Sequence, residues 1–187
     1  MDCDLPLLKA LHDKGHIVYY LLKVSPHSCN ATILNNFKLK QTSGLYSANE
    51  YECLHMFKEY FPLDNWYIVN QNSGTFKSIG NILNSLRLER LCKNFIKSIN
   101  PDIFHVTGIQ RNFDYLLSYI FRRKLIVTMH DPIPHSTAGI SRFKLWTAKL
   151  FFKLPKRVVL LNKQQTDAFC VRYNVDINRI SYSHLGS

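Results

Sequence analysis

A histidine and an aspartate, His130 and Asp131, directly follow an unbroken apolar run in the segment KLIVTMHDPIP, and prolines follow them. An apolar run without polar alternation is typical of a strand buried on both faces, as in a parallel sheet. Parallel sheets bind ligands beyond the carboxyl ends of their strands. This position favours a role for His130 at a reaction centre, where a neutral imidazole can hydrogen-bond a substrate without adding charge.

Further polar residues follow a second short apolar run, in DIFHVTG and the residues after it. His105 fits either a ligand contact or a hydrogen-bonded core histidine. Gly108 either lets the backbone approach a ligand or makes the turn. Arg111 could contact an anion at a helix N-terminus, although a solvated helix start is the favoured alternative. For Asp131 the favoured alternative is a cap on the turn before Pro132.

Helix and strand patterns alternate along the chain, and the elements that they predict must position those residues. Helices are predicted over 5–14, 49–60, 82–99, 113–121, 143–152 and 163–173, and strands over 17–23, 66–69, 102–106, 125–129, 157–161 and 179–182. Such alternation indicates βαβ units. The sequence therefore predicts an α/β fold, a three-layer α/β/α Rossmann-like parallel sheet, as one domain over residues 1–187. Residues 25–48, rich in Ser, Asn, Thr and Gly, are expected to be irregular.

Two of the predicted helices have informative patterns. The helix over 49–60 begins at Asn49, which can cap its N-terminus, and places Tyr51, Leu54, Phe57 and Phe61 on one face. The helix over 82–99 ends at Asn100-Pro101. Its apolar stripe is expected to comprise Leu88, Leu91, Cys92, Phe95, Ile96 and Ile99.

Net charge is the most unusual bulk property. The 187 residues include 24 Lys and Arg against 13 Asp and Glu, a formal net charge of +11. A charge of this size favours polyanionic partners such as anionic lipid, phosphorylated substrates or nucleic acid. No recognition helix, aromatic RNA-binding pair or zinc module is present, so no specific nucleic-acid partner is predicted. A glycine-rich nucleotide loop is also missing, which argues against dinucleotide oxidoreductases and P-loop enzymes.

Metal binding and membrane spanning are not predicted. His105, His130, Asp131 and His135 lack the helical spacing and local clustering of metal ligands. The five cysteines are scattered and include no CxxC pair, which favours reduced thiols in a cytoplasmic protein. No apolar stretch is long enough to cross a bilayer, and the N-terminus lacks the apolar region of a signal peptide.

The segment RFKLWTAKLFFKLPKR, residues 142–157, is both basic and amphipathic. Aromatic and aliphatic residues recur in it at helical spacing, and the pattern is typical of a helix that lies on a membrane surface. The favoured alternative is an ordinary helix that packs its apolar stripe on the sheet. The predicted surface-binding residues are Arg142, Lys144, Trp146, Lys149, Lys153, Lys156 and Arg157.

Four segments together resemble the N-terminal domain of GT-B glycosyltransferases, in particular family 4. KALHDKGHIVYYL is similar to the opening helix, Gly-His and following strand; INPDIFHVTG resembles the Pro-Asp strand and its histidine-containing loop. KLIVTMHDPIP is similar to the strand whose terminal histidine borders the active site. RVVLLNKQQTDAFCVRYNVDINRISYSHLGS resembles the last helix and strand before the second domain.

The resemblance implies one half of a GT-B architecture, the half that binds the acceptor. Family members usually have a strand and a glycine-rich loop ahead of the first helix, whereas Met1 here lies almost on that helix. The family's nucleotide-sugar site lies in a C-terminal domain, so the chain is expected to have no turnover alone. The resemblance implies transfer of a sugar, as by a hexosyltransferase, to a glycan or lipid-linked acceptor in cell-surface polysaccharide synthesis. His130 would line the reaction centre, His105, Gly108, Arg111 and Asp131 would contact the acceptor, and no metal or cofactor is implied. The expected location is cytoplasmic, peripheral at the inner membrane face. A non-catalytic module that binds a membrane or a partner is the alternative.

Overall fold

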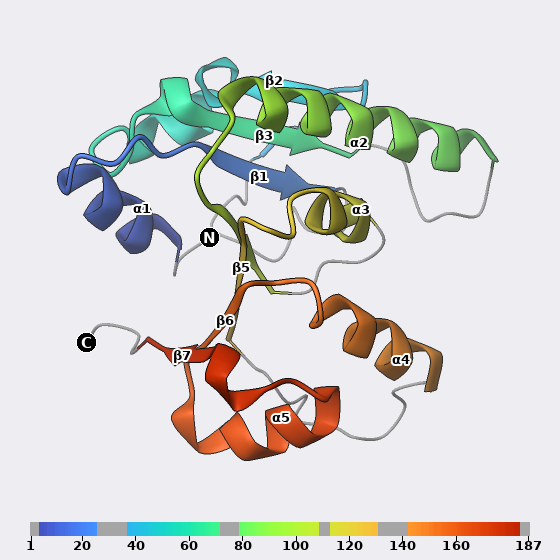
Figure 1. The fold of residues 1–187 in the computed structure, drawn as a ribbon. Coiled ribbons are helices and arrows are strands. Elements are labelled where there is room, and N and C mark those ends of the chain that lie inside the picture. The colour runs from blue at the N-terminus through green and yellow to red at the C-terminus, as the bar shows by residue number, and fades with distance from the viewer. Residues whose placement is uncertain (1–3, 26–36, 72–78, 109–112, 131–141, 184–187) are drawn as a thin grey trace. The chain divides into compact units, whose positions relative to one another are not determined.

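The structure is a computed structural model that describes residues 4–25, 37–71, 79–108, 113–130 and 142–183, without the side chains of Ile79, Phe113, Asp114 and Lys144. The chain divides into two compact units, Met1–Ser98 and Ile99–Ser187, and each is described by itself (Figure 1). That residues 1–187 form one domain stays a prediction.

The first unit contains a three-stranded sheet in the order β1-β3-β2. β1 (Tyr20–Val24) pairs in parallel with β3 (Trp66–Asn70), as expected for a βαβ-type fold. β2 (Gly44–Ser47) pairs antiparallel with the other edge of β3. This strand lies in the stretch that was expected to be irregular, so the sheet is mixed rather than wholly parallel.

Helical segments cover both faces of this sheet (Figure 1). On one face, Trp66 and Ile68 are fully buried in a core that includes residues of α1 (Asp4–Asp13). On the other, the Tyr67 ring lies 4.4 Å from Phe95 of α2 (Ile79–Ile99), centroid to centroid. Alternate β3 side chains therefore point into two separate cores, which explains why this strand carries no polar residue before Asn70.

The helix predicted over 49–60 is a series of short 3₁₀ turns instead. They comprise η1 (Ala48–Glu50) and η2 (Glu52–Phe57), and η3 (Leu63–Asn65) follows them. Tyr51 is extended, with φ −122° and ψ 103°, and this breaks the helix. The cap is Ser47 rather than Asn49, in a reciprocal capping box with Glu50. The predicted apolar face is nevertheless buried, at Tyr51, Leu54, Phe57 and Phe61.

α2 follows its predicted pattern except at one position. Leu88, Cys92 and Ile96 are buried, as the apolar stripe predicts. Leu91 is 40% exposed, so its assignment to the buried stripe was wrong. Leu91 lies about 100° around the helix from Cys92, and this places it outside the narrow face that α2 buries.

The second unit contains a four-stranded sheet in the order β4-β5-β6-β7, and every pair is parallel. Its strands are β4 (Phe104–Thr107), β5 (Leu125–Met129), β6 (Arg157–Leu160) and β7 (Ile180–Tyr182). Its helical segments are α3 (Phe113–Ile120), α4 (Arg142–Phe151), η4 (Lys163–Gln165), α5 (Thr166–Tyr173) and η5 (Ile177–Arg179).

The core of this unit lies between the sheet and its helices. Val127 and Leu160 pack with Phe152 and with Phe169 of α5, and all four are fully buried. Because the strands follow one another in order, right-handed crossovers place all their connecting helices on one face. The fold is thus the mixed α/β, Rossmann-like type that the alternation predicted, with a parallel sheet flanked by helices.

Candidate functional site

The carboxyl ends of β4 and β5 meet at one edge of the second unit's sheet. Thr107 of β4 is in register with Thr128 of β5, so both strands end within about two residues of each other. Gly108 and His130 directly follow these strands. The parallel sheet therefore brings two of the predicted site residues to the same edge, as strand-end geometry requires.

His105 and Thr128 form a hydrogen-bonded pair across the two strands. His105 Nε2 lies 2.7 Å from Thr128 Oγ1, and either the ring or the hydroxyl donates. The His105 residue is exposed, so it is not the core histidine that was one of the two alternatives. Both side chains lie on the face opposite Val127, which belongs to the core. The hydroxyl fixes one ring nitrogen of His105, so the orientation of the imidazole is set by a neighbouring strand.

Gly108 is in the left-handed region, with φ +75°. Its N–H donates to the carbonyl of Thr128 at 2.8 Å, which extends the strand pairing by one residue. A Cβ at this position would meet nothing within 4 Å. The glycine is therefore needed for its backbone angle rather than for space, which supports the turn among the two roles considered for it.

Thr128 was not among the sequence candidates, yet both neighbours depend on it. Its side chain bonds His105, and its carbonyl accepts from Gly108. The signal that could have found it is its polarity, because it is the one polar residue within the run Leu125–Met129. A polar side chain in such a strand indicates a face that is not simply core.

His130 is half-buried and lies in a bend immediately after β5, where the sequence predicted it. The next strand along the sheet contributes through its own end, because the Leu161 N–H donates to the Met129 carbonyl at 3.3 Å. Arg111 and Asp131 lie outside the described residues, and their predicted roles stay predictions.

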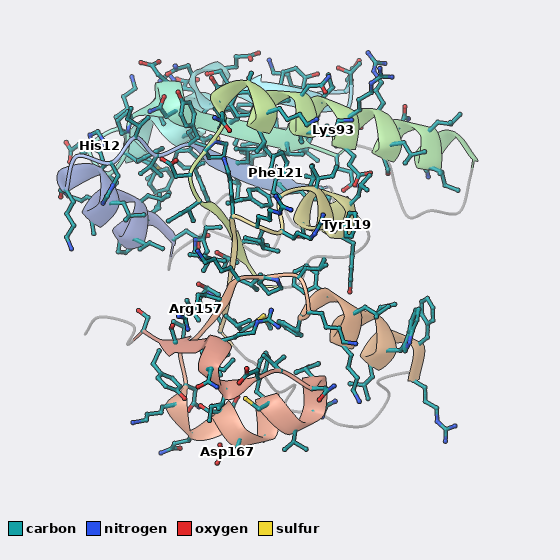
Figure 2. All side chains as sticks on the ribbon, in the orientation of Figure 1. His12, Lys93, Tyr119, Phe121, Arg157 and Asp167 are labelled. Atoms are coloured by element: carbon teal, nitrogen blue, oxygen red, sulfur yellow. The ribbon has the colours of Figure 1, made fainter. Side chains whose placement is uncertain are left out.

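The basic segment divides into residues with different surroundings. Arg142, Trp146, Lys153 and Lys156 are exposed, and Lys149 is half-exposed; the Lys144 side chain lies outside the description. Arg157 is exposed at the start of β6 but donates to the Asn178 carbonyl, so part of its role is to join β6 to η5 (Figure 2).

The described residues contain neither a cluster of metal ligands nor a membrane-spanning helix. Within the parts of the chain that are described, no group of three His, Cys, Asp or Glu side chains is arranged to hold a metal ion. Among the described helices, none combines the length and apolarity needed to cross a bilayer.

Comparison with known proteins yields a structural likeness. No protein-family model matches the chain, and no curated protein matches its sequence. In structure it is similar to a glycosyltransferase from Rickettsia africae ESF-5, with a TM-score of 0.55 and 19% sequence identity. The similarity covers 98% of this chain but 38% of that one. At this identity the likeness shows a shared glycosyltransferase fold.

Proposed function

We propose that this chain is the acceptor-binding domain of a GT-B, family 4-like glycosyltransferase. The supporting observation is that its fold matches a glycosyltransferase over 98% of its length while presenting Gly108 and His130 at a carboxyl strand edge, with His105 two positions before the end of β4. That edge is where open α/β sheets bind their ligands. The reaction would move a hexosyl group from a nucleotide-sugar to a glycan or lipid-linked acceptor, in cell-surface polysaccharide synthesis on the cytoplasmic side.

The residues at the edge fit distinct roles in this proposal. His130 would line the reaction centre, where glycosyl transfer develops positive charge on the sugar ring and fixed dipoles lower its energy. His105, whose ring Thr128 orients, would hydrogen-bond an acceptor hydroxyl. Gly108 would hold the turn that keeps the edge open. Arg111 and Asp131 would complete the acceptor side.

The nucleotide-sugar would be bound by a different domain. The chain spans 38% of the structurally similar glycosyltransferase, so the proposed donor site belongs to sequence beyond the matched region. No donor binding and no turnover are therefore expected from residues 1–187 alone. Hydrolysis of a nucleotide-sugar by the purified chain would overturn this part of the proposal.

Acceptor binding can be tested by amide NMR spectroscopy of the ¹⁵N-labelled chain. A panel of bacterial-type oligosaccharides is titrated, with UDP-glucose as the donor probe. We expect glycan-induced shifts at Gly108 and His130 and none with UDP-glucose. His130→Ala should weaken glycan binding about tenfold, the effect of one lost hydrogen bond to a ligand. The matched control is His12→Ala, at an exposed position on α1 (Figure 2). Shifts confined to residues away from the carboxyl strand edge would refute the site.

A further inference from the structure

Most of the net positive charge of the chain arises in one stretch. Residues 115–166 contain ten lysines or arginines and one acidic residue, Asp131, so they carry a net +9 of the chain's +11. From 132 to 166 there is no acidic residue at all. Charge concentrated in this way produces a strong local potential, and it favours a partner with a dense negative surface.

α4 lies within this stretch and exposes an apolar ridge. Phe143, Trp146 and Leu150 are 70%, 57% and 41% exposed. Their spacing of three and four residues aligns them along one side of the helix. The Phe143 and Trp146 rings are 6.1 Å apart, centroid to centroid, so they form a continuous apolar surface. The core contacts of α4 come from other residues, namely Leu145, Ala148 and Phe151.

Basic side chains lie beside this ridge rather than opposite it. At about 100° of rotation per residue, Arg142 and Lys149 fall with the three apolar residues in a sector of about 120°. Arg142 is exposed and Lys149 is half-exposed. The cations therefore lie along one edge of the apolar ridge. From that edge, Lys and Arg side chains can reach lipid phosphates while the ridge enters the interface.

The helix that carries the ridge is firmly anchored. Its inner face is buried, with Phe151 1% exposed and the adjoining Phe152 fully buried. Beyond its last turn, the Arg179 guanidinium donates to the carbonyls of Phe152, at 3.0 Å, and of Pro155. The ridge is thus presented by a helix that is held against the core of the second unit.

We propose that the outer face of α4, comprising Arg142, Phe143, Trp146, Lys149 and Leu150, binds an anionic lipid membrane. The apolar ridge enters the headgroup region while the cations remain among the lipid phosphates. Leu150 offers no stacking surface to a nucleic-acid base, which argues against a single-stranded nucleic acid. The area that a ridge one side chain wide can bury is far smaller than the roughly 800 Å² per partner of a stable protein interface. The inference stands apart from the acceptor role, because it needs neither donor nor acceptor.

Vesicle sedimentation tests the charge requirement. The chain is mixed with vesicles of phosphatidylcholine alone or of phosphatidylcholine with phosphatidylglycerol. We expect binding to the anionic vesicles only, weakened by added salt. Lys149→Gln should lower the partition coefficient about fivefold. The matched control Lys97→Gln, at an exposed position on α2, should change it less than twofold.

Tryptophan fluorescence tests the insertion. The chain has two tryptophans, and Trp66 is fully buried, so a blue shift on adding vesicles reports Trp146. Trp146→Phe should abolish the shift but retain sedimentation. Trp146→Gln should lower the partition coefficient about tenfold through the loss of apolar burial, whereas Val171→Gln, at a position 82% exposed on α5, should not.

The outcomes separate the alternatives. Equal partition into neutral and anionic vesicles, or none into either, overturns the proposal. Sedimentation without a blue shift overturns the insertion of the ridge. Displacement of bound protein from vesicles by low concentrations of DNA or RNA assigns the face to nucleic acid instead. Far-UV circular dichroism of each variant confirms that a lost signal does not arise from unfolding. The proposed glycan binding is measured without lipid, so either proposal can fail while the other stands.

Discussion

Asn70 at the end of β3 offers a sensitive test of how the first unit is held together. The residue is fully buried, and its side-chain Nδ2 donates to the Lys40 carbonyl at 2.9 Å and to the Thr42 carbonyl at 2.7 Å. These two bonds fasten the segment that leads into β2 onto the carboxyl end of β3. We expect Asn70→Leu to remove both bonds and to leave both carbonyls without those donors.

The expected magnitude follows from those two bonds. Each is worth about 1 kcal/mol net. The Lys40 carbonyl left unsatisfied costs about 1 kcal/mol more, whereas the Thr42 carbonyl still accepts from the Tyr46 hydroxyl, so Asn70→Leu should lower the free energy of unfolding by about 2–3 kcal/mol. Asn70→Asp should cost at least as much at pH 7, because it places a buried carboxylate against two carbonyl oxygens. Asn94→Asp, at an exposed position on α2, is the matched control and should change stability by less than about 0.5 kcal/mol.

The pH dependence of Asn70→Asp sharpens the test. Burial and the facing carbonyls raise the pKa of the new carboxyl above its unfolded value of about 4. The protonated acid can donate to one carbonyl. The stability that this group contributes is therefore fully present at or below about pH 4 and is lost as the pH rises through the folded pKa. Urea unfolding followed by Trp66 fluorescence, in a Trp146→Phe background, reports this unit. A pH-independent loss under about 0.5 kcal/mol would refute the reasoning.

Three further predictions concern other parts of the fold. Gly108→Ala should cost about 1 kcal/mol, because its φ of +75° strains an L-residue although no atom would clash, and thermal unfolding by circular dichroism measures it. Arg179→Met should lower the free energy of unfolding by about 2 kcal/mol, because it removes charged hydrogen bonds to the carbonyls of Phe152 and Pro155 beyond α4. Arg123→Met is the control, and an equal effect of the two variants would contradict a stabilising role for these bonds. Burial raises the pKa of Tyr51 to about 12, so its phenol stays protonated in the fold and stability falls as the pH rises above about 10. The Tyr51 hydroxyl is buried without a hydrogen-bond partner among the described atoms, so Tyr51→Phe should be neutral or stabilising at pH 7 and should reduce the alkaline loss in urea unfolding.

The bounds of an element could be predicted from the sequence where the burial of apolar residues alone determines the structure. The strand Leu125–Met129 has the predicted bounds because a continuous apolar run of five residues has few other uses in a parallel sheet. β2 could not be predicted in this way. It has four residues at a sheet edge, and its pairing with β3 depends on a partner 20 or more positions away.

The strand-end positions of His130 and Gly108 were predicted, but the contacts around them were not. Strand-end logic located His130 and Gly108, because it requires only the order of elements. The bond between His105 and Thr128 depends on the relative register of β4 and β5, which no local pattern encodes. Periodicity could not separate the buried from the exposed residues of α4 either, because both sets of residues are apolar.

The two sheets differ in how far along the chain their partners lie, and this bears on the order in which they form. In the second unit, Phe104 pairs with Leu125, Val127 with Val158 and Val158 with Ile180, which are 21, 31 and 22 positions apart. In the first unit, Tyr20 of β1 pairs with Trp66 of β3, which lies 46 positions later in the sequence. Loop closure costs more entropy over the longer separation, so the later-synthesised sheet is favoured to fold faster. On a ribosome, β1 would therefore emerge early yet remain an unpaired, apolar strand until β3 appears, which makes it the segment most in need of protection during synthesis.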